Sequence, residues 1–191
     1  MKSITFLFLS LVVCFYSCKT TKPIAEKSQS PNPVAVAAIA ASPEKTDFSE
    51  QKTWLLGYFN PVQLTHEPYS AWYIKSFDDY QVNSESFNKL LDINKDNLSI
   101  KVVMGTWCPD SRREVPRFMR VLDVWKFPAT KVTFIGVDNA KLSPVGEYIS
   151  LNIQRVPTFI IYKNNIEAGR IIENPVTSLE QDMVNILTRT E

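Results

Sequence analysis

Residues 99–126 read SIKVVMGTWCPDSRREVPRFMRVLDVWK, and this stretch decides the fold. Its first part, Ile100 to Met104, is a short apolar run rich in β-branched residues, which predicts a buried strand. Its second part has apolar residues at the i, i+3, i+4 and i+7 spacing of an amphipathic helix; they are Val115, Phe118, Met119 and Leu122. The stretch therefore predicts a strand that leads into a helix, with Cys108 between them.

Cys108 lies where this helix is expected to begin. With Cys108 as the N-cap, Pro109 takes the first helical position, where proline is preferred. Asp110 then falls in the first turn, where a negative charge meets the positive end of the helix dipole. Unpaired N–H groups at a helix start favour the thiolate form of a cysteine. Asp110 opposes the thiolate by charge repulsion, whereas Arg112 and Arg113 favour it if they fold back.

The predicted strand, the Trp107-Cys108-x-x motif and a helix interrupted by Pro116 together resemble the active-site segment of thioredoxin-fold proteins. A second segment, RVPTFIIYKN at 155–164, resembles the one that carries their cis-proline. The resemblance covers residues 84–191. It implies an α/β, thioredoxin-like three-layer fold with a central mixed sheet flanked by helices.

The resemblance also implies roles for individual residues. It places Cys108, Ser111 and Pro157 at the catalytic positions, with the proline packed opposite the cysteine. The backbone before the cis-proline pairs with an extended substrate in the family. The substrate-binding residues implied here are Trp107, Pro109, Asp110 and Val156.

Two departures from the family pattern change the expected chemistry. Ser111 stands where the resolving cysteine would be, and a hydroxyl cannot resolve a mixed disulfide. Val102 stands where many thioredoxins carry a buried acid. One hypothesis is therefore single-thiol exchange between Cys108 and a protein or low-molecular-weight disulfide. The alternative is a redox-silent binding module that holds extended peptides or partner proteins through residues 48–83 and the Pro157 groove.

Residues 1–18 have the pattern of a signal peptide, with Lys2 ahead of an apolar core too short to span a membrane. Ser17-Cys18 at the end of this core resembles a bacterial lipoprotein signal, which implies lipidation of Cys18; an ordinary secretory signal is the alternative. Residues 19–47 contain four prolines and no amphipathic period, which is typical of a disordered tether. The chain is expected in the cell envelope, facing the periplasm, lipid-anchored to the membrane or secreted.

Residues 48–83 form an aromatic-rich extension ahead of the predicted thioredoxin-like core, and together they make a domain of 48–191. A short helix is expected over Ser49–Leu56, and a strand or an irregular brace over Ala71–Phe77. The aromatic rings either fill a secondary core or form a wall that binds a partner near Cys108.

The rest of the chain predicts further elements in a regular order. A helix is expected from Ser84, with Ser84 as N-cap and Phe87, Leu90 and Leu91 on its apolar face. A strand at 131–138 follows, with Asp138 and Asn139 as a turn at the rim near Cys108, and then a short helix at 143–150.

Strands are expected at 156–162 and 167–172, joined by a Lys163-Asn164-Asn165 turn. The last helix has a Thr177–Glu180 capping box and an apolar stripe of Leu179, Met183, Ile186 and Leu187.

Composition narrows the function further. Apolar residues make up 45% of the 191 residues, enough for a sizeable core. A net charge of +1 gives no indication of nucleic-acid binding. His66 is the single histidine, which excludes His-rich metal sites, and no P-loop or metal-ligand spacing occurs. No cofactor is expected.

Overall fold

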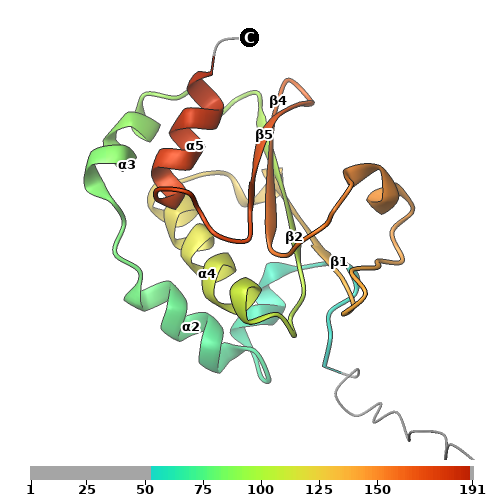
Figure 1. Ribbon diagram of the computed structural model, residues 1–191. Coiled ribbons are helices and arrows are strands. Elements are labelled where there is room, and N and C mark those ends of the chain that lie inside the picture. The colour runs from blue at the N-terminus through green and yellow to red at the C-terminus, as the bar shows by residue number, and fades with distance from the viewer. Residues whose placement is uncertain (1–52, 190–191) are drawn as a thin grey trace, which may run out of the picture. The chain divides into compact units, whose positions relative to one another are not determined.

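The computed structural model describes residues 53–189, which form an α/β unit around a five-stranded mixed sheet (Figure 1). The predicted signal peptide, the tether and Cys18 lie outside the described residues. The strand order is β1-β3-β2-β4-β5. β2 and β3 are parallel, and the other neighbouring pairs are antiparallel. The strands are β1 (Gly57–Phe59), β2 (Leu98–Met104), β3 (Val132–Gly136), β4 (Thr158–Lys163) and β5 (Ile166–Ile172).

Within residues 53–189, four α-helices lie on one side of the sheet, two of them next to it and two packed on these, and short 3₁₀ helices connect other segments (Figure 1). The helices are α2 (Ser70–Asp79), α3 (Ser84–Leu91), α4 (Pro109–Val124) and α5 (Leu179–Thr188). The 3₁₀ helices are η1 (Pro61–Thr65), η2 (Ala129–Lys131) and η3 (Gly146–Leu151). The helix predicted at 143–150 is thus the 3₁₀ helix η3.

The helix-covered face of the sheet contains the larger core. Phe118 of α4 stacks on Phe159 of β4 with ring centroids 4.2 Å apart. Trp125, at the end of α4, is buried and donates its ring N–H to the Leu90 carbonyl at 2.9 Å. Each fully buried side chain of this size contributes about 1.5–3 kcal/mol of hydrophobic stabilisation. A smaller cluster on the opposite face includes Val103 and Tyr148 and is covered by η3.

The junction between β2 and α4 is as the sequence predicts. Cys108 is the N-cap, with extended φ and ψ angles of −79° and 124°, and Pro109 opens the helix. Val115, Phe118 and Leu122 are buried on the sheet side of α4. Because this apolar face fixes the helix to the sheet, the position of Cys108 is fixed as well.

The prediction of a strand or brace over Ala71–Phe77 is wrong, because this segment lies within α2. Tyr73 and Phe77 are spaced at i and i+4, and their rings stack with centroids 6.2 Å apart. Two arginines of α4, Arg117 and Arg120, lie over the rings of Tyr80 and Phe77 at 5.8 and 5.3 Å. Among the described aromatic residues of the extension, one is buried in the core, Tyr73, and four pack against the core, as one of the two hypotheses states: Phe59, Tyr69, Trp72 and Tyr80.

The prediction of a helix over Ser49–Leu56 is wrong for its described part, since residues 53–56 are not helical. The chain continues into β1, which pairs with β3. Gly57 has a φ of 73°, a conformation that side chains disfavour. A Cβ on Gly136 would overlap the Leu55 carbonyl, so only glycine allows the segment to approach β3 this closely.

Two predicted helix starts differ from the observed ones. Asn83, rather than Ser84, caps α3 by accepting from the Ser86 N–H at 3.0 Å. The helix has Leu90 buried, but Leu91, predicted on its apolar face, is 57% exposed.

At α5 the predicted capping box is wrong. Ser178 is the N-cap and accepts from the Gln181 N–H at 3.2 Å. Glu180 is fully buried and accepts from the Tyr80 hydroxyl and the Asn83 N–H, both at 3.2 Å. The Glu180 carboxylate therefore binds donors that are distant in the sequence, instead of the backbone of Thr177 as a capping box requires.

The turn between β4 and β5 is as predicted. Asn164 and Asn165 have φ angles of 53° and 62°, and Lys163 pairs with Ile166 across the hairpin. Two consecutive positive φ values match the handedness of a two-residue hairpin turn, and asparagine tolerates them.

Candidate functional site

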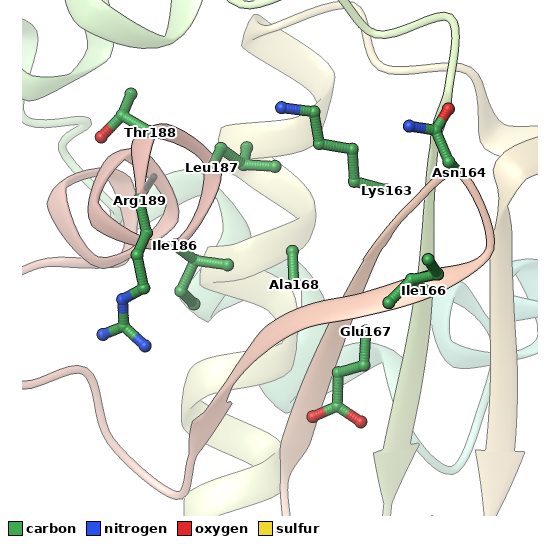
Figure 2. A pocket seen from close by; sticks show the side chains of 9 residues that line it. All are labelled: Lys163, Asn164, Ile166, Glu167, Ala168, Ile186, Leu187, Thr188 and Arg189. Atoms are coloured by element: carbon green, nitrogen blue, oxygen red, sulfur yellow. The ribbon is translucent and has the colours of Figure 1, made fainter. Parts of the chain in front are cut away.

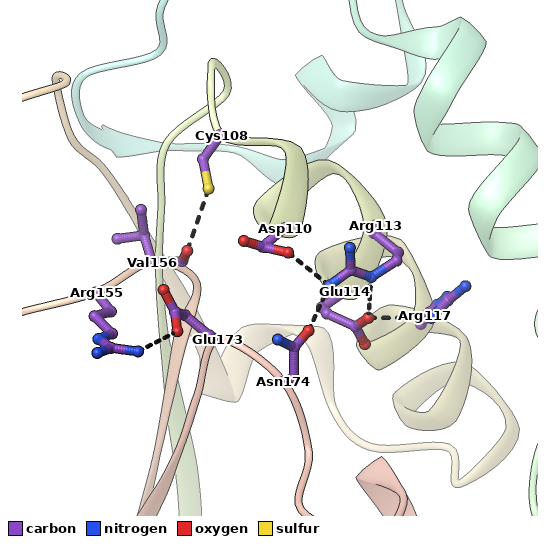
Figure 3. Close-up of polar contacts among 9 residues, drawn as sticks. All are labelled: Cys108, Asp110, Arg113, Glu114, Arg117, Arg155, Val156, Glu173 and Asn174. Carbon is purple, nitrogen blue, oxygen red and sulfur yellow. Dashed lines mark hydrogen bonds and ion pairs between the residues drawn. The ribbon is translucent and has the colours of Figure 1, made fainter.

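The site is built around Cys108 and the loop before β4. The Cys108 thiol donates to the Val156 carbonyl with an Sγ–O distance of 3.3 Å (Figure 3). The Val156–Pro157 peptide bond is cis, as predicted. Cys108 is 7% exposed and packs in the smaller apolar cluster with Val156. The structure thus brings Cys108, Val156 and Pro157 together, with most of the cysteine covered.

The loop ahead of Cys108 is folded tightly. The Trp107 ring lies over Gly105, where an added Cβ would be 2.5 Å from ring atoms. Its ring N–H donates to the Val137 carbonyl at 3.0 Å, just after β3. The Cys108 N–H donates to the Gly105 carbonyl at 3.0 Å. These contacts place the tryptophan on the β3 side of the loop, while the thiol faces β4.

Ser111 is fully buried, and its hydroxyl accepts from the Gly105 N–H at 3.3 Å. It therefore supports the same loop from the first turn of α4. Pro109 is exposed, and Asp110 is partly exposed beside it.

The two arginines after Ser111 have separate partners, and Figure 3 shows those of Arg113. Arg113 pairs with Asp110 and Glu114, each at 2.6 Å, and also donates to Asn174 in the loop after β5. The hydrogen bond to Glu114 is the main reason why the pKa of Arg113 is raised. Arg112 donates to the Thr106 carbonyl at 2.6 Å. The charge of Asp110, which opposes a thiolate, is thus paired.

The remaining rim residues have structural partners. Arg155 forms an ion pair with Glu173 at 2.7 Å (Figure 3) and stays largely exposed, as expected for a surface arginine. Asp138 closes a turn, since its carboxylate accepts from the Leu142 N–H at 2.8 Å. This bears out the turn predicted after β3.

Two cavities differ in their relation to this site. One of about 480 Å³ adjoins the loop before β4 and is lined by Asn152, Gln154, Arg155, Thr158, Arg170, Ile172 and Glu173. Another, of about 590 Å³, lies between the β4–β5 hairpin and the end of α5 (Figure 2). Lys163 borders the second cavity and pairs with Leu98 at the start of β2. Since Cys108 follows the end of β2, the second cavity belongs to the opposite end of the sheet.

The extension also contacts the Cys108 loop, which the sequence does not predict. The rings of Trp54 and Trp107 are tilted by 53° with centroids 6.4 Å apart. The Leu55 N–H donates to the Thr106 hydroxyl at 3.3 Å. The density of aromatic residues was the one signal for this contact, and it does not identify which ring reaches the loop.

Residues 53–189 contain neither a candidate metal site nor a helix that could cross a membrane. Histidine, cysteine, aspartate and glutamate form no group of three or more there that would hold a metal ion. None of the helices in this range combines the length and the apolar composition that crossing a bilayer requires.

The chain was compared with known proteins. No family model matches it, and no curated protein matches it. Among solved structures, it is similar to a protein of unknown function from Pseudomonas aeruginosa, with a TM-score of 0.49 and 12% sequence identity. The match covers 69% of this chain and 90% of the other.

Proposed function

We propose that this protein is a thioredoxin-like member of the cell envelope that exchanges disulfides through the single thiol of Cys108. The observation that carries the proposal is the position of Cys108: it caps α4 directly after a sheet strand, with Sγ 3.3 Å from the carbonyl that precedes a cis-proline. In the proposed reaction, Cys108 attacks from the start of α4, and Val156 and Pro157 form the opposite side of the substrate groove.

The exchange has two steps that balance. The Cys108 thiol loses its proton to solvent, and the thiolate attacks one sulfur of a substrate disulfide. A bond forms between Cys108 and that sulfur, while the other sulfur leaves as a thiolate. A second thiol from another molecule then attacks the mixed disulfide and releases Cys108 in reduced form. Ser111 takes no part in this release, because its hydroxyl is buried and bonded to Gly105.

The resting geometry opposes the first step. A thiolate cannot donate a hydrogen bond, so the contact with the Val156 carbonyl is lost when Cys108 ionises. The cysteine is also 7% exposed, so the side chain or its loop has to move before a disulfide reaches Sγ. Exchange is therefore expected to be slower than for a fully exposed thiolate, with Trp107, Pro109 and Asp110 bordering the entering substrate.

The covered thiol also supports a second candidate function, a redox-silent module that binds an extended peptide or a partner protein. In this role the Cys108 thiol serves to hold the Val156 loop, and the cavity beside Arg155 and Thr158 contributes to binding. The two candidates make opposite predictions for Cys108→Ser. The serine variant keeps the shape of the loop and its hydrogen bond, but it cannot form a disulfide.

Mixed-disulfide trapping distinguishes the two functions. The full chain is incubated with glutathione disulfide and with a peptide disulfide, and adducts on the peptide containing Cys108 are measured by mass spectrometry. Adducts that a second thiol removes support exchange. A chain that stays folded and forms no adduct contradicts it, and C108S then keeps any binding or cellular role.

We also propose that Cys18 carries the lipid anchor, as the Ser17-Cys18 motif suggests. Metabolic labelling with a fatty-acid analogue checks this, with Cys18→Ala and Cys14→Ala as the matched pair. Label that persists in C18A, or its absence from the native chain, rules the anchor out.

A further inference from the structure

We propose that Trp54 is a positioning residue for the Cys108 site: it holds Trp107, and with it the loop that keeps the thiol against Val156. This role of Trp54 rests on the proposed function in one respect, which is that Cys108 is the reacting group. It concerns a segment, residues 53–56, that precedes the part of the chain with the thioredoxin-like motifs.

The loop 105–107 is held by contacts from several sides. From α4, the Ser111 hydroxyl binds Gly105, and the Arg112 side chain binds the Thr106 carbonyl. From the end of β3, the Val137 carbonyl binds the Trp107 ring. On the β4 side, the thiol of Cys108 itself makes the contact, with the Val156 carbonyl.

The segment 53–56 supplies the remaining anchors. Trp54 packs beside Trp107, with ring centroids 6.4 Å apart, and the Leu55 N–H donates to the Thr106 hydroxyl. Thr106 is 2% exposed, so its hydroxyl has little access to water as a substitute donor. The segment is itself fixed, because the Leu55 carbonyl lies directly against Gly136 of β3.

The arrangement couples Trp54 to the thiol through the backbone. Trp107 and Cys108 are consecutive residues, and the ring of the first faces β3 while the thiol of the second faces β4. If Trp107 is released from its position over Gly105, the peptide between the two residues is free to turn, and the thiol loses its place against Val156. Loss of Trp54 should therefore expose Cys108 without any direct contact between the two side chains.

The test measures access to Cys108 by two thiol reagents of different size, iodoacetamide and a bulky maleimide, over a range of pH. The label is quantified on the peptide that contains Cys108, in the full chain. Trp54→Leu is expected to raise the ratio of bulky to small reagent rates between about twofold and tenfold, the factor that an aromatic pair contributes to a closed state. Trp54→Phe keeps a ring at the site and should restore most of the native ratio.

Trp72→Leu is the matched control, because Trp72 lies in the same extension but packs beside Tyr69 and Tyr73. It should lower stability and leave the rate ratio unchanged. An equal rise in W72L and W54L, or an unchanged ratio in a folded W54L, overturns the proposal.

If W54L does not fold, a second pair of variants, at Thr106, tests the role of the segment 53–56. Thr106→Val removes the acceptor for the Leu55 N–H, whereas Thr106→Ser keeps it. A higher ratio in T106V than in T106S supports the role of the segment, and equal ratios contradict it. Alkylation needs no disulfide partner, so a failure of the proposed exchange leaves this result unaffected.

Discussion

Replacing Gly136 by alanine should destabilise the protein strongly, since the new methyl group would meet a backbone segment. A Cβ at this position would be 2.6 Å from the Leu55 carbonyl carbon and 3.2 Å from the Leu56 nitrogen. Carbon atoms prefer separations of about 3.5–4.0 Å, and the Leu55 carbonyl oxygen lies closer than its carbon, so the segment 53–56 has to retreat by at least about 1 Å. No side-chain rotation relieves the overlap, because the atoms it meets belong to the main chain.

The expected cost has two parts. Overpacking of this kind costs about 1–3 kcal/mol. The retreat also breaks the hydrogen bond between Leu55 and the buried Thr106 hydroxyl, which adds about 1 kcal/mol. Gly136→Ala should therefore lower the free energy of unfolding by about 2–4 kcal/mol, which many domains survive.

Urea denaturation followed by circular dichroism measures this change, and Gly146→Ala provides the matched control. A Cβ on Gly146 meets nothing within 4 Å, and its φ lies outside the positive range. Alanine there should be neutral or stabilise by up to about 1 kcal/mol, through the unfolded chain. If G136A is no less stable than G146A, the result contradicts the close packing of residues 53–56 against β3.

Three further predictions concern separate parts of the protein. Ser111→Cys adds a thiol that resolves the mixed disulfide within the chain, so it should speed up the reduction of a disulfide substrate by a dithiol; turnover equal to that of the native chain in an insulin-reduction assay contradicts this. Tyr80→Phe should cost about 1–3 kcal/mol in the free energy of unfolding, because the buried Glu180 carboxylate loses one of its donors; an unchanged urea midpoint would count against it. The pKa of Glu147 is lowered from 4.5, first by the Tyr58 hydroxyl and then by Lys101; a lowered folded-state pKa adds stability at higher pH that is lost as the pH falls through it. The small stability advantage over Glu147→Gln should thus shrink below about pH 4.5, and an advantage that grows on acidification in paired melting curves refutes the assignment.

The sequence predicts best those elements whose signals are local. The β2 run, the N-cap at Cys108 with Pro109 after it, and the Asn164-Asn165 turn all follow from residues within a few positions of one another. Each is specified by backbone preference and by one buried face. The cis peptide before Pro157 is different, because it was expected from the resemblance alone.

The predictions are wrong where contacts with residues distant in the sequence determine the structure. In α2, aromatic residues that favour strands in general are helical, because Tyr73 is buried in the core and Phe77 packs beneath Arg120 of α4. Glu180 lies within a plausible capping motif, but Tyr80, a hundred positions away, supplies its donor.

The same reason explains the incomplete prediction of the site. Trp107 and Cys108 are visible in the sequence as a motif, whereas the contacts of Trp54 and Leu55 with that motif depend on the path of β1. No spacing rule connects residues that a sheet brings together.

The pairing of β1 with β3 also bears on how the chain can be shortened. β1 is the outermost strand on its side, and it occupies the hydrogen-bonding edge of β3 from Phe134 to Gly136. A protein starting at Ser84, where the recognisable motifs begin, would leave that edge open beside apolar side chains. Open edges recruit strands from other molecules, so such a fragment should self-associate even if its sheet forms. Residues 53–83, which contain β1, are therefore expected to limit such self-association.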